Sequence, residues 1–503
     1  MQEARCKWMH SREIRERIVI TGRLVLETPA HFGGDGGITM VDMPLHRDSL
    51  TGRAVLTGAS LAGALRNYLR EREQGYRADG KKGSLENTLL GFQKDDEGEQ
   101  SWLIVSDVLA EENPFPAGDE ANGKFTDETA HGNKSAGYQI ELRDGVAVNA
   151  ATRVAEDKKK YDWELLAAGA GFPLRLELLV KEGDREKLLH GLAITLQGLE
   201  RGEIALGARK NRGFGRCRVN WWEVHHYNLG RPEGLWAWLS GGEGEKAGGP
   251  RISELLNVPD ADLDRRGLFS LDAIFTLDGS LIIRSGSGGA DDPDAVHLRS
   301  FRLKRHRPVP VLSGTSLAGA LRARALRIAR TIGPEENATD LVNGLFGPPG
   351  ESRAPRAGRL AVEETEIVAP LEQVVNRVKI DRFTGGAFPA ALFNEQPLYG
   401  LDETRVKVKL TVQNPEEEEI GLLLLLLKDL WTGDLPLGGG AGIGRGRLRG
   451  LEARVACINN GRLEKEWLLR ETSVNQLIIE GGPPEELEKH VRAFVRRMEE
   501  NGL

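Results

Sequence analysis

Two aspartates with similar surroundings are the residues of this chain best suited to chemistry on a phosphate. Asp42 is followed five residues later by Arg47, and Asp294 is followed five residues later by Arg299, each in a glycine-containing loop. A carboxylate beside cations can hold a divalent ion or accept a proton, so both aspartates are candidate catalytic and metal-binding residues. Turn formation is the alternative for both, because aspartate is common in turns.

Basic residues also gather at two glycine-rich turns. The first, at 206–219, reads LGARKNRGFGRCRV, and the second, at 437–448, reads LGGGAGIGRGRL. Glycine lets backbone amides face an anion, so both turns are candidate phosphate sites, with a solvated β-turn as the alternative. The candidate contacts are Arg209, Lys210, Arg212, Gly213, Gly215 and Arg216 in the first turn and Gly442, Gly444 and Arg445 in the second. The pattern pairs Gly213-x-Gly215-Arg216 with Gly442-x-Gly444-Arg445.

A ten-residue motif follows each aspartate loop. It reads TGASLAGALR at 57–66 and SGTSLAGALR at 313–322, with eight of ten positions identical. Ser60 and Ser316 are typical N-cap residues, and leucines four apart predict a helix with one buried face. The N–H groups at such a helix start can bind a backbone phosphate, with Arg66 and Arg322 adding charge, whereas a capped core helix is the alternative.

The repeated motif lies within a longer duplication that predicts two domains. The matching elements run over 15–225 and 267–455, joined by a linker at 226–266 that contains GGEGEKAGGPR. Residues 456–503 form a C-terminal extension with a helix from Pro483 to Met498. Each copy orders its elements as strand, loop, helix, strands, helix, strand. This order indicates an α+β fold whose antiparallel sheet carries its helices on one face.

The overall composition narrows the class of protein. The chain has 503 residues and a formal net charge of -7, so any binding of nucleic acid must rely on local basic patches. The three scattered cysteines argue against a disulfide framework and a zinc site. The longest apolar run, Leu422 to Leu427, is too short to span a bilayer. We therefore expect a cytoplasmic protein that does not contact a membrane.

Taken together, these motifs resemble the RAMP superfamily, and specifically the backbone subunits of type III CRISPR effector complexes. In the first copy the resemblance rests on His31-x-Gly33-Gly34, on Asp42-x-Pro44-x-x-Arg47, and on the helix that contains Ser60 and Arg66. In the second copy it rests on the helix of Ser316 and Arg322, on Ile380-Asp381-Arg382-x-Thr384-Gly385, and on Gly442-x-Gly444-Arg445. Two units in one chain resemble the fused subunits of the type III-D variant.

The resemblance implies two tandem ferredoxin-like (RRM-like) domains, each with a protruding thumb, that bind a guide RNA. The thumb strand of the family matches Ile380-Asp381-Arg382-x-Thr384-Gly385 in the second copy and, in degraded form, residues 148–153 in the first. RNA contacts are implied at His31, Gly33, Gly34, Arg47, Ser60, Arg66, Arg299, Ser316, Arg322, Asp381 and Arg382, besides the two glycine turns. Asp42 and Asp294 would cleave a complementary single-stranded target RNA with Mg²⁺ or Mn²⁺. Asp294 lies twenty residues before Gly314, whereas Asp42 lies sixteen before Gly58. The implied partners are the other effector subunits, including a large polymerase/nuclease subunit.

Two other functions remain open at this stage. The chain could be a non-catalytic structural subunit that binds guide RNA, with both aspartates inert. It could also be a metal-independent ribonuclease that processes guide RNA through a histidine, for which His31 and His46 are the candidates. Tandem duplication favours a subunit that follows a long RNA. The basic run RLKRHR at 302–307 is a further candidate phosphate contact.

Overall fold

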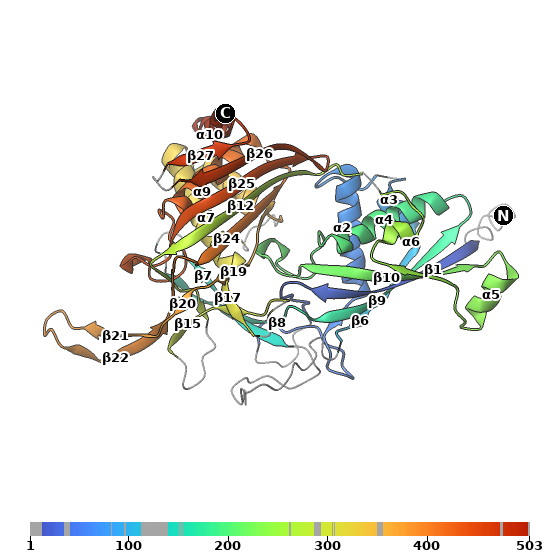
Figure 1. The fold of residues 1–503 in the computed structure, drawn as a ribbon, viewed down its shortest axis with the longest axis horizontal. Helices are drawn as coiled ribbons and strands as arrows, with labels where there is room; N and C mark the ends of the chain where they lie inside the picture. The colour runs from blue at the N-terminus through green and yellow to red at the C-terminus, as the bar shows by residue number, and fades with distance from the viewer. Residues whose placement is uncertain are drawn as a thin grey trace.

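Two α+β units lie side by side in the computed structural model (Figure 1). The structure describes residues 13–34, 41–81, 83–94, 97–111, 139–149, 152, 154–260, 263–285, 293–303, 305, 307–349, 356–472 and 476–500. The first unit holds the N-terminal half of the chain, and the second holds the C-terminal half. No helix in these ranges is long and apolar enough to cross a membrane.

The first unit is built on a five-stranded sheet in the order β11-β10-β1-β9-β5. Its strands are β1 (Ile14–Leu26), β5 (Leu103–Val105), β9 (Gly171–Lys181), β10 (Cys217–Asn228) and β11 (Glu245–Gly249), and all neighbours are antiparallel. The covering helices are α2 (Gly58–Gln74), α3 (Leu85–Leu90), α4 (Arg185–Glu200) and α6 (Ile252–Leu255). Alternating apolar residues such as Ile18 and Ile20 of β1 pack into one core with the leucines of α4, as the period of a half-buried strand requires.

The second unit repeats this plan on a larger sheet, in the order β16-β17-β19-β24-β12-β25-β26-β27. Its main strands are β12 (Gly267–Asp278), β17 (Val309–Leu312), β18 (Leu360–Val362), β19 (Thr365–Val368), β24 (Arg405–Gln413), β25 (Arg447–Asn459), β26 (Arg462–Glu471) and β27 (Leu477–Glu480), with β16 (Arg299–Ser300) at one edge. Its helices are α7 (Gly314–Ile332), α8 (Glu335–Phe346), α9 (Glu417–Trp431) and α10 (Pro484–Glu499).

The two units correspond element by element. The central strand β1 lies between β9 and β10, and β12 lies between β24 and β25, all antiparallel. Helix α7 corresponds to α2, and α9 corresponds to α4. The predicted duplicated α+β architecture with antiparallel sheets is confirmed at this level, and the finer ferredoxin-like assignment stays a prediction.

Short strands and two hairpins complete the units. The first hairpin is β7 (Ile140–Val148) with β8 (Ala155–Leu166), and the second is β21 (Val375–Ile380) with β22 (Ala387–Gln396). The β21–β22 hairpin stands out from the body in Figure 1. The remaining strands are β2 (Val55–Leu56), β3 (Phe92–Lys94), β4 (Glu97–Glu99), β6 (Val108–Leu109), β13 (Ser280–Leu281), β14 (Arg284–Ser285), β15 (Ala295–His297), β20 (Leu371–Glu372) and β23 (Leu398–Tyr399).

The predicted linker and extension turn out to be integral to the units. Residues 245–249 form β11, whose Gly249 lies opposite Trp222, and Ile252 of α6 is fully buried in the first core. A glycine-rich segment reads as a linker, but here it forms an edge strand. After residue 455 the chain adds β26 and β27 to the second sheet, and Phe494 of α10 is buried. The helix expected from Pro483 to Met498 is observed as α10.

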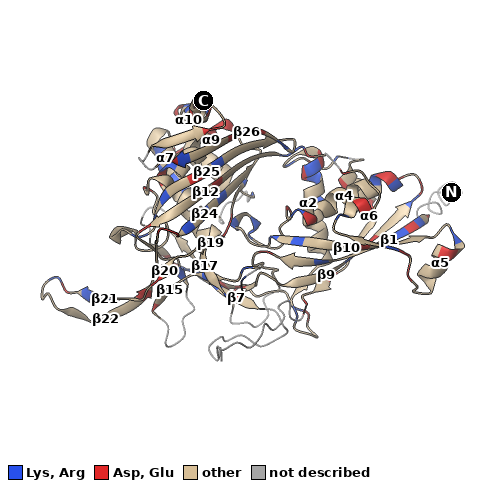
Figure 2. Cartoon of the chain, in the orientation of Figure 1, with Lys and Arg blue, Asp and Glu red and all other residues tan. Residues whose placement is uncertain are grey.

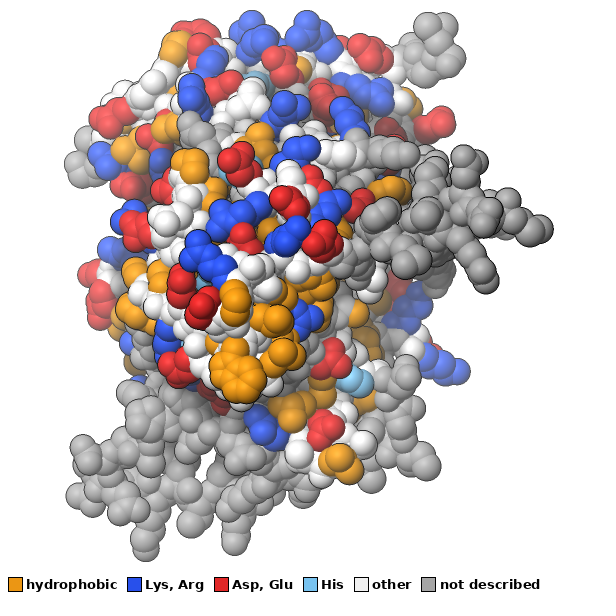
Figure 3. All heavy atoms as spheres, turned by 90° about the vertical axis from the view of Figure 1, so that its right-hand side faces the viewer, with side chains coloured by type: hydrophobic (Ala, Val, Ile, Leu, Met, Phe, Trp, Pro, Cys, Tyr) orange, Lys and Arg blue, Asp and Glu red, His pale blue; other side chains and the backbone are white. Residues whose placement is uncertain are grey.

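Charged residues of both signs occur throughout the two units, whereas a helix at the outer end of the first unit carries a group of exposed apolar side chains. Acidic and basic residues are interspersed along both units in Figure 2, as expected for a chain with 75 acidic and 68 basic residues. At the outer end of the first unit lies helix α5 (Pro232–Leu239), which has no buried residue. It exposes Leu235, Trp236 and Leu239. Figure 3 faces this end and shows hydrophobic side chains gathered among charged ones.

Candidate functional site

A groove of about 480 Å³ lies at the start of α2 in the first unit. Three segments line it: the loop with His31 and Gly33, the first three turns of α2 with Ser60 and Arg66, and the glycine turn up to Lys210. The structure thus brings together five residues that the sequence predicted as RNA contacts. His46 and Asn67 also line the groove.

The start of α2 is capped differently from the prediction. The N-cap is Thr57, whose side chain accepts from the Ser60 N–H at 3.2 Å, and Ser313 caps α7 through Ser316 in the same way. Ser60 and Ser316 are therefore in the first turn of the helix and are not the caps. The Gly58 N–H donates to Asp107 Oδ1 at 2.6 Å. The start of a helix attracts anions, and the Asp107 carboxylate already occupies that position on α2. A phosphate would therefore bind further along the groove.

Arg66 and Arg322 have the same structural role in the two units. Arg66 donates to Gly91 O at 2.9 Å and to Leu90 O at 2.5 Å, and it also pairs with Glu86. Arg322 donates to Gly347 O and to Asn343 Oδ1. Burial lowers the pKa of Arg322. Both guanidinium groups hold the end of the following helix, and a phosphate contact by either stays a prediction.

An aromatic cluster holds one arginine of the first glycine turn. The guanidinium of Arg209 lies 4.9 Å from the ring centre of Tyr161 and 4.6 Å from that of Trp163, and it donates to the Tyr161 hydroxyl at 2.6 Å. Arg209 has a left-handed backbone, with φ of 55°. A non-glycine residue in this conformation is uncommon and needs support from its surroundings. Among the described residues no carboxylate forms an ion pair with Arg209, whose neighbours in the chain, Ala208 and Lys210, line the groove.

His31 links the groove to the same cluster. Its ring packs 5.7 Å from that of Trp163, which lies 4.9 Å from Phe214. His31 Nδ1 contacts the carbonyl oxygen of Glu164 at 2.8 Å, and the side chain is only 6% exposed. The next residue but one, Gly33, leaves room for this ring, since a Cβ there would lie 3.3 Å from His31 Nε2. A Cβ on Gly34 would lie even closer to its neighbour, 2.8 Å from His46 Cα.

In the second unit an ion pair replaces this aromatic contact. Glu395 occupies the position of Trp163, because both lie in a parallel bridge with the residue after the loop aspartate. Arg445 occupies the position of Phe214 and donates to Glu395 Oε2 at 2.8 Å. Arg445 is 4% exposed, so its charge is paired with Glu395 inside the protein and does not reach the surface. The two units therefore differ in chemistry at the base of the hairpin.

Asp42 and Asp294 make the same contact in the two units. The Asp42 N–H donates to Asp162 Oδ1 at 2.7 Å, and the Asp162 N–H donates back to Asp42 Oδ2 at 3.0 Å. The Asp294 N–H donates to Asn394 Oδ1 at 2.7 Å, and the Asn394 N–H donates to Asp294 Oδ2 at 2.8 Å. Each pair ties the loop to the second strand of the adjacent hairpin, so the aspartates occupy equivalent positions.

The longer spacing in the second unit lies after the aspartate. Arg47 bridges to Ala54, seven residues on, and Arg299 bridges to Pro310, eleven residues on. The aspartate-to-arginine spacing is unchanged, and the second unit has a longer loop between Arg299 and Pro310, of which the structure describes residues 300–303, 305 and 307–309. Arg47 pairs with Glu164 at 3.1 Å, and Arg299 pairs with Glu372.

The basic run in this longer loop contacts protein. Arg302 pairs with Glu364 at 2.8 Å, and Arg305 pairs with Glu366 at 2.7 Å. The loop also contacts the first unit, because Ser300 Oγ and the Phe301 N–H donate hydrogen bonds to Glu141 Oε1 at 3.0 and 2.8 Å. Arg302 and Arg305 of RLKRHR are therefore engaged in ion pairs, whereas Arg307 is exposed.

The glycine turns correspond with a shift of two residues from the predicted pairing. The Gly215 N–H donates to Pro29 O, and its carbonyl accepts from the Leu206 N–H. Gly446, not Gly444, makes these contacts in the second unit, with Ser280 O and the Leu437 N–H. Both glycines have positive φ, and a Cβ would lie 1.8 or 1.9 Å from the facing carbonyl oxygen, so glycine is required. Gly213 therefore pairs with Gly444, and Gly442 is equivalent to Asn211.

Arg212 and Arg216 lie at the contact between the units. Arg216 Nη1 pairs with Glu363 Oε2 at 2.5 Å, and Arg212 Nη2 donates to Phe346 O at 3.4 Å. Burial, together with the nearby Arg322 and Arg209, lowers the pKa of Arg212. These two predicted phosphate contacts have partners in the second unit, while Lys210 remains at the groove.

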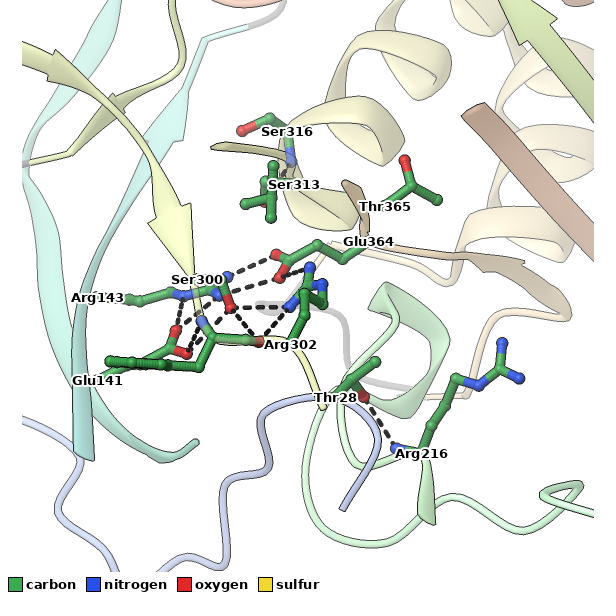
Figure 4. A network of polar contacts seen from close by, with 12 residues as sticks. Thr28, Glu141, Arg143, Arg216, Ser300, Arg302, Ser313, Ser316, Glu364 and Thr365 are labelled. Atoms are coloured by element: carbon green, nitrogen blue, oxygen red, sulfur yellow. Dashed lines mark hydrogen bonds and ion pairs between the residues drawn. The ribbon is translucent and has the colours of Figure 1, made fainter. Parts of the chain in front are cut away.

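Figure 4 shows the buried network that joins the units at this contact. Arg143 of β7 pairs with Glu364 at 2.5 Å and with Glu141 at 2.9 Å. Glu364 has no exposed side-chain surface and also pairs with Arg302. Burial alone would raise the pKa of Glu364, but Arg143 and Arg302 outweigh burial and hold the pKa below its usual value.

The predicted thumb residues of the second unit lie at the tip of the β21–β22 hairpin. Asp381 and Arg382 are in the turn that follows Ile380, where Asp381 Oδ1 accepts from the Phe383 N–H at 2.9 Å. That backbone contact lowers the pKa of Asp381. Phe383 is 96% exposed at this tip. The first-unit counterpart, 148–153, lies partly outside the described residues.

The described residues contain no group of three or more His, Cys, Asp or Glu side chains placed to hold a metal ion. Asp42 and Asp162 nevertheless place two carboxylates together, and each uses one oxygen on its partner's N–H. One or two carboxylates are what magnesium usually takes from a protein, with water and phosphate supplying the rest. In the second unit Asn394 leaves Asp294 as the single carboxylate of the pair.

Comparison with known proteins identifies the family. A model described as the RAMP superfamily matches residues 23–218 and 274–449, one segment in each unit and well over half of the chain. The chain belongs to the RAMP superfamily. RAMP proteins are RNA-binding components of CRISPR complexes, and some of them cleave RNA. No curated protein matches the chain.

Sequence reasoning missed several residues of the two RAMP units. Asp162 and Asn394 lie 120 and 100 residues from their aspartate partners, so no local pattern marks them. Tyr161 and Trp163, which hold Arg209, alternate along β8 with Asp162 between them. This alternation of aromatic residues on one strand face, in an otherwise charged segment, was the available signal.

Proposed function

We propose that the chain is a backbone subunit of a type III CRISPR ribonucleoprotein that binds guide RNA along both units, with the fused arrangement of the type III-D variant. The observation that carries this proposal is the groove at α2, which joins a histidine loop, a helix start and a glycine turn in a chain of the RAMP superfamily. Arg209 and Lys210 supply local positive charge there, although the whole chain is acidic.

Binding through this groove would depend on phosphates and not on base sequence. Lys210 lines the groove, and Arg209 is held beside it by two aromatic rings without a carboxylate partner among the described residues. Such cations neutralise phosphates and release counterions, so affinity falls with salt and is similar for all sequences. The other effector subunits, including a large polymerase/nuclease subunit, would hold the acidic chain on the RNA.

We further propose that the first unit cleaves the target RNA, with Asp42 as the catalytic residue. Asp42 and Asp162 would hold Mg²⁺ or Mn²⁺ through their remaining carboxylate oxygens, and the ion would neutralise charge on the scissile phosphate. Asp42 would accept the proton of the attacking hydroxyl. Asp294 would act in the second unit with Asn394 in place of the second carboxylate.

The test is to map the fragments of a complementary target RNA cut by the complex in magnesium and in chelator. Asp42→Asn keeps an oxygen for the Asp162 N–H while removing charge, so it should abolish one cut and leave guide binding unchanged. Asp294→Asn should abolish the other cut. Asp162→Asn recreates the native Asp–Asn pair of the second unit. It should preserve the loop contact, and because it removes a proposed ligand of the ion it tests whether the second carboxylate is needed for the cut.

The same contact supports a second candidate function. Each aspartate ties its loop to a hairpin, which is a structural role that needs no metal. If Asp42→Asn and Asp294→Asn leave every product band unchanged, the chain is a non-catalytic guide-binding subunit. Processing of guide RNA through His31 has less support, because that ring is buried and one nitrogen is bonded to Glu164 O.

A further inference from the structure

Glu164, in the second strand of the β7–β8 hairpin, contacts the aspartate loop, which we define as residues 42–47. Glu164 Oε2 accepts hydrogen bonds from the Leu45 N–H at 3.0 Å and from Arg47 Nη2 at 3.1 Å. The Glu164 side chain is 20% exposed, so water and salt screen its pair with Arg47 only in part. One carboxylate oxygen thus holds a main-chain donor and a charged donor of the same loop.

The Glu164 carboxylate takes the place of a main-chain acceptor. The Met43 N–H donates to Asp162 O at 3.2 Å, and the Glu164 N–H donates to Met43 O at 3.0 Å. A regular parallel ladder would continue with the Leu45 N–H donating to Glu164 O. That carbonyl oxygen contacts His31 Nδ1 instead, at 2.8 Å, and the Glu164 side chain accepts from Leu45. Glu164 therefore joins the aspartate loop to the loop of His31.

Two residues of β8 hold the aspartate loop at its two ends. Asp162 and Glu164 are two apart in the strand, so they lie on the same face of it. Asp162 exchanges hydrogen bonds with Asp42, and Glu164 holds the far end of the loop. Without the Glu164 carboxylate the far end would lose two contacts, but the His46 N–H would still donate to Phe32 O at 2.7 Å. The loop would then shift relative to Asp162 and stay attached to the unit.

The second unit keeps the ion pair although its carboxylate has moved. The register of the hairpins places Gln396 at the position of Glu164 and Glu372 at that of Ile140. Arg299 pairs with Glu372, and Gln396 Nε2 donates to Glu372 Oε2 at 3.3 Å. The two differences compensate each other. A carboxylate opposite the arginine is thus supplied by a different residue in each unit, as expected for a contact that the aspartate loop requires.

We propose that Glu164 is the positioning residue for Asp42 in cleavage of the target RNA. Its carboxylate fixes the far end of the aspartate loop against the hairpin and so sets where Asp42 lies. The carboxylate also occupies Arg47, a cation of the same short loop that would otherwise compete with a metal ion for the Asp42 carboxylate. This inference rests on the proposed cleavage at Asp42.

The test measures cleavage of a complementary target RNA by the assembled complex in magnesium, with the complex in excess so that each rate reports the cutting step. Glu164→Ala should slow the cut assigned to Asp42 by about tenfold or more, as loss of a residue that orients a metal ligand usually does. The affinity for target RNA and the cut assigned to Asp294 should not change. Glu177→Ala is the matched control and should cut as the wild type does. Glu177 lies 3.1 Å from Arg17 and is 16% exposed, but it is on β9, outside the loop.

Transfer of the second unit's arrangement separates positioning from a general loss of stability. Glu164→Gln should slow the Asp42 cut less than Glu164→Ala, because the amide keeps an oxygen for the Leu45 N–H. Adding Ile140→Glu to Glu164→Gln recreates the Glu372–Gln396 arrangement and should restore most of the lost rate. Hydrogen exchange at residues 43–47 should accelerate in Glu164→Ala, but not in Glu177→Ala, while the strands of the first sheet keep their protection.

The outcomes distinguish this inference from the proposed function. If Asp42→Asn abolishes a cut that Glu164→Ala makes at the wild-type rate, cleavage by Asp42 stands and the positioning role is overturned. A slower cut that is fully explained by weaker target binding, or an equal loss in Glu177→Ala, would overturn the role as well. If Asp42→Asn leaves every cut unchanged, the proposed cleavage fails and the positioning role fails with it.

Discussion

Replacing Glu364 by glutamine should loosen the two units without unfolding either core. The side chain of Glu364 is fully buried and pairs with Arg143, which is 5% exposed, and Arg302, which is 12% exposed. The substitution leaves two guanidinium groups at a buried site with a neutral partner. Removing one member of a buried pair usually costs about 3–5 kcal/mol.

The structure places the expected cost near the lower end of that range. Arg143 retains Glu141 at 2.9 Å, and Arg302 retains Ser300 Oγ and Phe301 O at 2.8 and 3.0 Å. We therefore expect a loss of about 3 kcal/mol, confined to the contact between units. Each unit has its own apolar core, so each should stay folded.

Calorimetry and hydrogen exchange together provide the assay. In Glu364→Gln the thermal transition should broaden or split, and exchange should accelerate in β7, β19 and the 300–302 loop. The control is Glu366→Gln, whose partner Arg305 is half-exposed, so the change should be at most about 1 kcal/mol. Equal effects of the two substitutions, or no effect of Glu364→Gln, would refute the view that this network joins the units.

The same network predicts a dependence on pH. Because Arg143 and Arg302 hold the pKa of Glu364 below its usual value, the stabilisation is complete above that usual value. It is lost as pH falls through the lowered pKa. The splitting of the transition should therefore appear in the wild type only at acidic pH, and Glu364→Gln should show it at neutral pH.

Further predictions concern the RNA groove and the turns. Arg209→Met should weaken binding to all single-stranded RNAs alike and reduce the slope of log affinity against log salt by about 0.7 in filter-binding titrations; an effect restricted to one sequence would contradict the phosphate contact. Gly215→Ala should lower the free energy of unfolding by more than about 1 kcal/mol, since φ is +74° and Leu206 O blocks a side chain, whereas Gly442→Ala should stay within about 0.5 kcal/mol. Equal midpoints in urea for the two alanine variants would be inconsistent with this account of the turn. Cys217, whose pKa burial raises to about 12, should react with iodoacetamide only after unfolding, as mass spectrometry of the labelled chain would show.

The sequence predicted the duplication and the α+β class because one motif is repeated at eight of ten positions and its flanking strands recur in order. It placed the helix caps wrongly because Thr57 and Ser60 are both good caps, and only the backbone shows which accepts the hydrogen bond. It shifted the glycine turns because GIGRGR contains two overlapping Gly-x-Gly-Arg patterns, and hydrogen bonds of Gly446 select the second.

The sequence predicted those parts of the candidate site that depend on local motifs and missed those that depend on distant partners. The loop of His31 and the turn of Lys210 are each short motifs of neighbouring residues, so each could be assigned to a phosphate site from its residue types alone. The partners of Asp42, Arg216 and Glu364 are distant in the chain, so they depend on packing that no local pattern encodes. That packing directs two of the predicted cations, Arg212 and Arg216, toward the second unit.

The most direct test of the central claim is to isolate the tagged chain from its own cells and measure the length of the RNA that resists nuclease. A guide-binding subunit should retain short RNA of uniform length, and Arg209→Met combined with Lys210→Ala should reduce the amount recovered. A chain that retains no RNA, or only fragments of random length unaffected by these substitutions, would contradict the claim that it binds guide RNA.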